Sequence, residues 1–218
     1  VSFFTSMPTF CQNGCSLSAS GRARLGEVYN SSGNLQLDRA MFEAYNFIKM
    51  RFGVNPSFQY VLDADSPNAF ASPKANNPLY PDGSVYFGLQ LMQAECTNSY
   101  LNMCSSLVIV LAHELAHVVD FKYGSGFSDT KRAELFADYL AGAMVYVYTT
   151  QFKQINIQEN ALSLFSKGDY AFNDEDHHGT PQERLTCMLA GFNDAMQIGF
   201  QFTLPVAIQR ARMFVSGF

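Results

Sequence analysis

The sequence has few charged residues, no basic run and no long apolar stretch. Asp, Glu, Lys and Arg make up 15% of the 218 residues, and the formal net charge is −5. Without a cluster of Lys and Arg, the chain lacks the positive patch by which proteins bind nucleic acid or an anionic membrane. No apolar run reaches the roughly 18 residues that a bilayer crossing needs. We therefore expect neither a nucleic-acid partner nor a transmembrane segment.

Internal repeats and a second domain boundary are also lacking. Apolar residues make up 48% of the chain, with 20 Phe and 11 Tyr, which is typical of a folded globular protein. A length of 218 residues suits one domain with a substantial core. We expect a single domain over residues 1–218, with an irregular arm at 1–33, the main core at 34–200 and a C-terminal helix at 201–218.

Cysteine is sparse, but four of the five cysteines form two close pairs in the sequence. Cys11 lies near Cys15, and Cys96 lies near Cys104, whereas Cys187 stands alone. Local pairs of this kind predict small disulfides and an oxidising compartment. Together with the low Lys content, they favour a periplasmic or secreted protein. The alternative is a cytoplasmic protein with five free thiols.

Apolar periodicity predicts mainly helices, together with two strands. Thr180-Pro181-Gln182-Glu183 is a helix start, with Thr as the N-cap, Pro at the first position and Glu three residues after the cap. Expected helices lie at 37–52, at 107–121, from a cap within 128–130 to about 150, at 181–198 and at 205–214, with short helical segments at 22–29 and 159–165. Expected strands lie at 57–62 and 84–90, separated by a long loop at 63–83.

The stretch LVIVLAHELAHVVDF at 107–121 carries His113, Glu114 and His117 as a His-Glu-x-x-His motif. On a helix, the two histidines lie on one face, about 40° apart, where they can share one metal ion. Glu114, about 100° round from His113, can reach a water on that metal but is poorly aimed as a ligand. This division of roles is typical of zinc hydrolases.

A core helix with two satisfied histidines and a stray glutamate is the alternative interpretation of this motif. The chain has only four histidines, so the motif is a specific signal. Burying two imidazoles and a carboxylate without a metal or other partners would also cost several kcal/mol. We therefore prefer the metal site.

A catalytic zinc ion takes three protein ligands and leaves one position open. The expected third ligand is Glu134, which begins the next helix seventeen residues after His117. Asp138, one turn further on, can accept a hydrogen bond from the outer nitrogen of a ligand histidine. Asp120 is a rival third ligand, and a solvated helix face is the alternative for Glu134 and Asp138.

Three further residues are assigned by their chemistry. Glu114 is expected to act as the general base toward the attacking water. His178 is the candidate donor to the developing oxyanion, with His177 as the alternative. Arg184 is expected to steady the site carboxylates. The alternative for His177 and His178 is an exposed polar loop, and the alternative for Arg184 is an ordinary surface arginine.

An extended peptide can add to an exposed sheet edge. The strand at 84–90 is the expected edge, and its Tyr86 and Phe87 point to opposite faces because side chains alternate along a strand. One of the two is therefore expected to contact substrate while the other belongs to the core.

The chain resembles the gluzincin zinc metallopeptidases of the HtpX, Oma-type and CAAX prenyl protease group. The resemblance covers about residues 60–190 and implies a mostly helical α+β gluzincin core, with a small sheet whose edge strand borders the active-site cleft. It also implies one metallopeptidase domain with zinc on His113, His117 and Glu134 and substrate contacts at Asn68. The matching motifs are Asn68-Ala-Phe-Ala-x-Pro73, Val85-Tyr86-Phe87, His113-Glu-Leu-Ala-His117, Glu134-x-x-Ala-Asp138 and His178-Gly-Thr-Pro-x-x-Arg184. Because membrane helices are missing, the chain would be a soluble, periplasmic-like member.

The function expected from the sequence is that of a zinc-dependent endopeptidase acting on a peptide or protein substrate. A non-catalytic metal-binding or chaperone-like module is one alternative, and it leaves the glutamate at position 114 without a role. An amidase acting on a non-peptide amide is the other.

Overall fold

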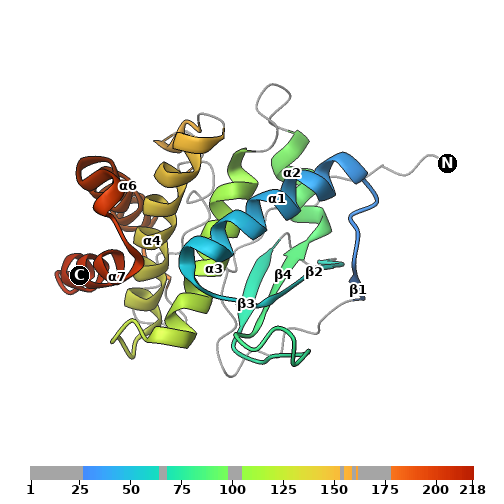
Figure 1. Cartoon of the computed structure of the whole chain (residues 1–218), viewed down its shortest axis with the longest axis horizontal. Coiled ribbons are helices and arrows are strands. Elements are labelled where there is room, and N and C mark those ends of the chain that lie inside the picture. Colours follow the sequence, from blue (N-terminus) through green and yellow to red (C-terminus); the bar gives the residue numbers. More distant parts are fainter. Residues whose placement is uncertain (1–26, 64–67, 98–104, 153–154, 159–160, 162–177) are drawn as a thin grey trace.

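The computed structural model describes part of the chain, and in that part a small sheet lies beside a stack of helices (Figure 1). The described residues are 27–63, 68–97, 105–152, 155–158, 161 and 178–218. The helices are α1 (Leu35–Phe52), α2 (Leu89–Thr97), α3 (Ser105–Tyr123), α4 (Thr130–Gln151), α6 (Pro181–Ile198) and α7 (Leu204–Val215), with a 3-10 turn at Gly199–Gln201. The strands are β1 (Val28–Tyr29), β2 (Ser57–Val61), β3 (Ala69–Ser72) and β4 (Ser84–Gly88). The mostly helical α+β class is confirmed.

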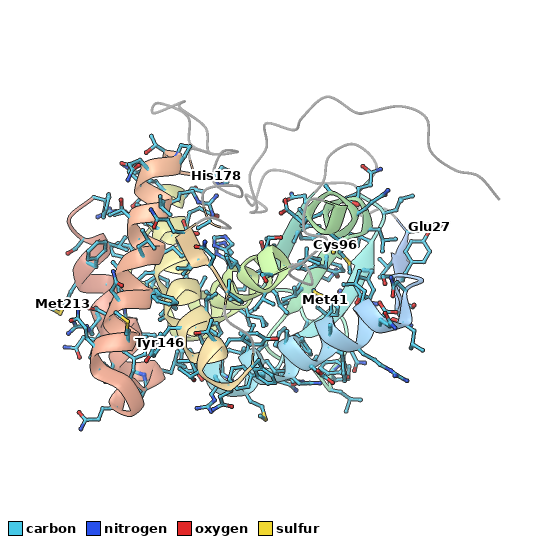
Figure 2. The ribbon with its side chains drawn as sticks, turned by 90° about the horizontal axis from the view of Figure 1, so that it is seen from above. Glu27, Met41, Cys96, Tyr146, His178 and Met213 are labelled. Carbon is cyan, nitrogen blue, oxygen red and sulfur yellow. The ribbon has the colours of Figure 1, made fainter. Side chains whose placement is uncertain are left out.

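The elements are arranged in layers around α3. Figure 2 shows α6 and α7 on one side, the sheet and α1 on the other, and α3 and α4 between them. Helix α3 contacts α1, α4 and β3, while α4 also contacts α6 and α7. The central position of α3 explains why its residues are apolar on almost every side, as the sequence predicted.

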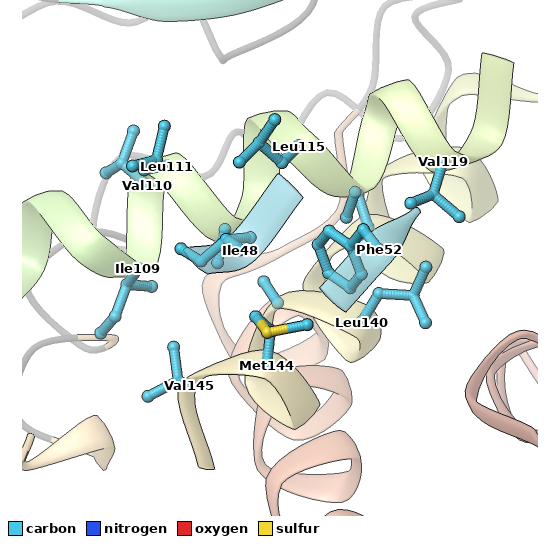
Figure 3. Close-up of a cluster of buried hydrophobic side chains, with 14 of the residues drawn as sticks. Ile48, Phe52, Ile109, Val110, Leu111, Leu115, Val119, Leu140, Met144 and Val145 are labelled. Carbon is cyan, nitrogen blue, oxygen red and sulfur yellow. The ribbon is translucent and has the colours of Figure 1, made fainter. Parts of the chain in front are cut away.

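Helix α1 follows the pattern expected from its sequence and begins two residues earlier than predicted. The Asn34 side chain accepts hydrogen bonds from the backbone N–H groups of Gln36 and Leu37, which makes it the N-cap. Gly53 ends the helix with φ of 60°, a left-handed conformation that glycine adopts without strain. The buried face of α1 therefore packs against α3 and α4, and Figure 3 shows Ile48 and Phe52 between those two helices.

The sheet has the order β1-β2-β4-β3, with β2 and β4 parallel and the other two pairs antiparallel. The strand predicted at 84–90 is therefore an interior strand, and its expected position at the sheet edge is wrong. The edge next to α3 is β3, which lies inside the predicted loop 63–83. A strand of four residues is too short to show an alternation of apolar and polar side chains, so periodicity could not reveal β3.

Two further expectations about local structure need correction. Val28 and Tyr29 were expected in a helical turn, but they pair with Val61 and Tyr60 as strand β1. Residues 89–90 begin helix α2 rather than ending a strand, because the Asp63 carboxylate accepts hydrogen bonds from the backbone N–H groups at 90 and 91 and fixes a helix start there. The remaining residues of the predicted segments 22–29 and 159–165 lie outside the described part, except for residues 27 and 161.

Helices α3 and α4 run in opposite directions side by side, as the short connection between them predicted (Figure 1). The Asp129 side chain caps α4 by accepting a hydrogen bond from the Arg132 backbone N–H. Helix α6 begins with the complete capping box of Thr180 and Glu183, and this prediction is confirmed. The start of α4 and the start of α6 are thus both fixed by side-chain caps.

Two glycines let α4 and α6 approach until their backbones touch. A Cβ atom on Gly142 would collide with the Met188 carbonyl oxygen, and one on Gly191 would collide with the Tyr139 carbonyl oxygen. The contact between α4 and α6 is therefore one of backbone against backbone, and a methyl group has no room in it.

Cys96 is disulfide-bonded, which supports the expectation of disulfides in this chain. Cys187, the other cysteine in the described residues, is a buried free thiol, so the partner of Cys96 lies outside that part. The predicted partner Cys104, and the predicted pair Cys11 and Cys15, also lie outside it.

None of the helices in the described ranges combines the length and the hydropathy that a bilayer crossing requires.

Candidate metal centre

Helix α3 brings the three residues of the His-Glu-x-x-His motif into the interior of the protein. His113 is 3% exposed, His117 is 5% exposed, and Glu114 is completely buried. The Nε2 atoms of His113 and His117 lie 3.0 Å apart, so both imidazoles point at one place. The shared face predicted from their four-residue spacing is therefore present in the fold.

Helix α4 supplies the predicted third residue from across the gap. Glu134 Oε2 lies 3.2 Å from His113 Nε2, and Glu134 Oε1 lies 3.4 Å from His117 Nε2. Glu134 is 1% exposed. Among the described residues, these three side chains form a buried group that could hold a metal ion.

The distances in this group suit a small tetrahedral ion. Ligand atoms about 2.05 Å from one ion at the tetrahedral angle lie about 3.3 Å from one another. The two imidazole nitrogens are 3.0 Å apart, and each lies close to a different oxygen of the Glu134 carboxylate, His113 Nε2 at 3.2 Å from Oε2 and His117 Nε2 at 3.4 Å from Oε1, so the separations are near that value. Two imidazole nitrogens and one carboxylate are also a donor set that zinc accepts. The residues present therefore fit a metal ion.

The rival third ligand, Asp120, does not join this group in the structure. Its Oδ1 atom accepts a hydrogen bond from the Ser125 backbone N–H, just beyond the end of α3. Asp120 thus stabilises the turn between α3 and α4. The reason lies in helix geometry, because a residue three positions after His117 is already close to the free carbonyl end of the helix.

Asp138, one turn after Glu134 on α4, connects the group to α6. Its Oδ1 atom lies 2.8 Å from His113 Nδ1, the ring nitrogen on the far side from Nε2. The Arg184 guanidinium donates two hydrogen bonds to the same carboxylate, 2.8 Å from Nε to Oδ2 and 3.0 Å from Nη2 to Oδ1. Arg184 Nη2 also lies 3.6 Å from Glu134 Oε2. The predicted supporting roles of Asp138 and Arg184 match this arrangement.

The charges in the centre shift one another's pKa values. Burial alone would raise the pKa of Asp138, but Arg184 and His113 outweigh it and hold the pKa below its usual value. Burial alone would lower the pKa of His113, but the carboxylates of Asp138 and Glu134 raise it to about 10. A metal ion takes a neutral imidazole as ligand, so binding at Nε2 would release a proton.

Glu114 occupies an unusual position for a carboxylate. Neither of its oxygens has a hydrogen-bond partner within the part of the chain that the structure describes. Burial raises its pKa to about 7, although His113 and His117 act in the opposite direction. A pKa near neutrality is the value at which a carboxylate serves best as a general base at physiological pH.

The residues before and within α6 complete the cluster. His178, which lies just before α6 (Figure 2), is 9% exposed, and its Nδ1 atom is 3.6 Å from Glu134 Oε1. Gly179 follows with φ of 91°, so the chain turns sharply there before the cap at Thr180. His178 is therefore at the centre, as predicted, while its alternative His177 lies outside the described residues.

The three predicted substrate-contacting residues are not brought to this centre. Phe87 is fully buried in the main core. Tyr86 stacks on Phe70 on the opposite face of the sheet. The Asn68 carbonyl accepts a hydrogen bond from the Gly88 N–H, so this residue supports the pairing of β3 with β4. The assignments of Tyr86 and Phe87 assumed that β4 was the edge strand, and its interior position removes that basis.

Phe121 is a neighbour of the centre that the sequence reasoning missed. Its ring lies nearly parallel to that of His117, with 6.5 Å between centroids and 19° between planes, and it is 43% exposed. Its position could have indicated this contact, because it lies four residues after His117 on the same helix face.

Comparisons of the chain with protein-family models, with curated proteins and with solved structures find no match.

Proposed function

We propose that this protein is a zinc-dependent endopeptidase, with His113, His117 and Glu134 as metal ligands. The observation that carries the proposal is the buried, unpartnered carboxylate of Glu114 beside that ligand group, with its pKa raised to about 7. A metal-storage site has no need of such a base. The proposal also agrees with the resemblance of the sequence motifs to gluzincin metallopeptidases.

A bound zinc ion would supply Lewis-acid polarisation of the substrate carbonyl and of the attacking water. In this proposal Glu114 accepts a proton from that water and delivers it to the leaving nitrogen. His178 donates a hydrogen bond to the carbonyl oxygen as negative charge develops on it. Asp138 fixes the orientation of the His113 ring, and Arg184 fixes Asp138.

The sheet edge beside α3 supports a peptide as the substrate. Strand β3 is an edge strand, and it contacts α3. Because the Asn68 carbonyl pairs with β4, alternation along the strand directs the backbone groups of Ala69 and Ala71 toward the free edge. An extended peptide can pair with those groups. We therefore assign to β3 the substrate-aligning role that the sequence suggested for the strand at 84–90.

The decisive experiment compares wild type with Glu114→Gln for zinc content and for cleavage of casein. Glu43→Gln, the same change at an exposed position of α1, is the matched control. We expect one zinc ion per chain in all three proteins and cleavage by wild type and Glu43→Gln alone. Equal cleavage by Glu114→Gln would overturn the assignment of the base. Zinc without cleavage in wild type would favour a non-catalytic metal-binding or chaperone-like module.

The ligand set has its own test, which separates zinc from a purely structural cluster. Glu134→Ala removes the only carboxylate of the described ligand group, so zinc affinity should fall and a chelator should no longer lower the melting temperature. Wild type should lose thermal stability when the chelator is added. Full zinc affinity in Glu134→Ala would discard this residue as a ligand. Peptide and non-peptide amide substrates, compared side by side, distinguish an endopeptidase from an amidase.

We also propose a periplasmic or secreted location, with a cytoplasmic one as the alternative. The disulfide at Cys96 supports it, because such bonds persist mainly in oxidising compartments. Mass spectrometry of native material without reduction tests this proposal. A reduced Cys96 in that material would contradict it.

A further inference from the structure

The face of the sheet away from the helices carries a pocket of about 360 Å³. All four strands contribute to it, β1 through Val28 and β2 through Gln59. Side chains alternate along each strand, so the pocket and the metal centre lie on opposite faces of the sheet. Ala69 and Ala71 of β3 belong to the main core, whereas Phe70 between them lines the pocket. The proposed peptidase chemistry makes no use of this pocket.

Two aromatic side chains that line the pocket, Phe70 and Tyr86, are packed against each other and fixed in place. The rings of Phe70 and Tyr86 stack, with 4.9 Å between centroids and 27° between planes. Both residues are buried, and with Val61 they form a hydrophobic cluster separate from the main core. The Asn76 side-chain amide donates a hydrogen bond to the Tyr86 hydroxyl and holds that ring in position. The parts of these rings that line the pocket are apolar and rigidly held, and an aromatic ring can pack against them edge to face or in an offset arrangement.

The rim of the pocket carries positive charge and no negative charge. Lys74 lines it, and within the described ranges its Nζ atom has neither an ion-pair nor a hydrogen-bond partner. No Asp or Glu among the described residues lines the pocket, although the chain has 19 acidic and 14 basic residues. Glu27, next to Val28, points to the other face and accepts a hydrogen bond from Tyr29. The charge of the rim therefore favours an anionic group near Lys74.

We propose that this pocket binds a small aromatic carboxylic acid. The ring of the ligand lies against Phe70 and Tyr86, and its carboxylate pairs with Lys74 Nζ. Ser72 and Gln59 offer further polar groups at the rim. The volume of about 360 Å³ is at the lower end of the range found for small-molecule sites, so a ligand of one or two rings fits best.

The test is a titration of the zinc-loaded protein with 2-naphthoate. The chain has no Trp, so naphthyl fluorescence can be followed against a tyrosine background. We expect saturable binding that weakens about fivefold in Lys74→Met, because an exposed ion pair contributes up to about 1 kcal/mol. Lys131→Met is the matched control, since it removes the same charge on α4 near the metal centre. Neutral 2-naphthamide should bind as weakly to wild type as 2-naphthoate binds to Lys74→Met.

Lys74 is exposed, so its substitution leaves the fold intact and the comparison remains interpretable. Absence of saturable 2-naphthoate binding to wild type would overturn the proposal. Equal affinities of wild type and Lys74→Met for 2-naphthoate would also overturn it. A loss of binding in Lys131→Met alone would overturn it as well, because it would place the ligand at the metal centre. A second variant, Phe70→Leu, should reduce the preference for naphthoate over the non-planar cyclohexanecarboxylate.

Discussion

Asp138 Oδ1 lies 2.8 Å from His113 Nδ1 and thereby sets which nitrogen of that ring faces Glu134. Replacing the carboxylate with an amide in Asp138→Asn weakens this contact and leaves the Arg184 guanidinium without its charged partner. We expect zinc affinity to fall about 10- to 100-fold, as observed for such supporting carboxylates. Competition with a chromophoric chelator measures the change.

Asp194→Asn is the control for that experiment, because Asp194 also accepts two hydrogen bonds from an arginine, Arg210, but at the joint of α6 and α7. It should retain wild-type zinc affinity. Equal affinity in wild type and Asp138→Asn would show that the contact with His113 contributes nothing to metal binding.

His178 is the residue whose substitution should separate catalysis from metal binding. Its Nδ1 atom is near Glu134, but the residue is not one of the three that form the described ligand group. In His178→Ala we expect kcat to fall about 100-fold or more, the usual loss for one oxyanion donor, with zinc content unchanged. Steady-state kinetics and metal analysis of the same sample check both. His177→Ala is the control, and a larger effect there would transfer the role to His177.

The close contact of α4 with α6 predicts a strong effect of a single methyl group. Gly191→Ala places a Cβ atom against the Tyr139 carbonyl oxygen, and the two helices must separate to accept it. We expect the free energy of unfolding to fall by about 2 kcal/mol or more, as in other overpacked cores. Gly217→Ala, near the C-terminus, meets no such obstacle and should change it by less than about 0.5 kcal/mol. Urea denaturation measures the free energy of unfolding of both variants. Similar losses in Gly191→Ala and Gly217→Ala would contradict the close backbone contact between α4 and α6.

The ion pair between Asp194 and Arg210 predicts a pH dependence of stability. Hydrogen bonds from Arg210 hold the pKa of Asp194 below the usual 3.8. A carboxyl group whose pKa is lower in the folded state than in the unfolded state stabilises the folded protein. That stabilisation is complete above the unfolded-state pKa and is lost as pH falls through the folded-state pKa. Asp194→Asn should therefore be about 1 kcal/mol less stable than wild type near pH 7. The difference in unfolding free energy between the two proteins should shrink as pH falls below 3.8 and through the folded-state pKa, and a constant difference would refute the ion-pair origin.

Local signals in the sequence were sufficient for most helices and for the three residues of the candidate metal group. The spacing of His113 and His117 fixes their common face, and the capping residues Thr180 and Glu183 fix the start of α6. The short connection after α3 brings Glu134 back to both histidines. Each of these relationships depends on residues close together in the chain or on one antiparallel turn, and such relationships are the ones that periodicity and capping describe.

Sheet topology was beyond the reach of the same reasoning. Whether the strand at 84–88 is interior or at the edge depends on which other strands pair with it, and β3 is too short to be recognised before that pairing is known. The assignment of Tyr86 and Phe87 to the substrate lost its basis for this reason. Asp120, the rival to Glu134 as third ligand, instead accepts a hydrogen bond from the backbone N–H of Ser125, a contact within the turn that residue spacing alone does not reveal.

The candidate centre draws on α3, α4 and α6, whose contributing residues extend from His113 to Arg184 along the chain. A folding intermediate that has formed α3 alone would present two imidazoles but neither the opposing carboxylate nor the guanidinium that anchors its neighbour. In the proposed zinc site, the full ligand set therefore exists only once α3 and α4 have packed together, and its supporting guanidinium only once α6 has docked. Zinc binding, as proposed, would then follow the packing of these helices rather than nucleate it.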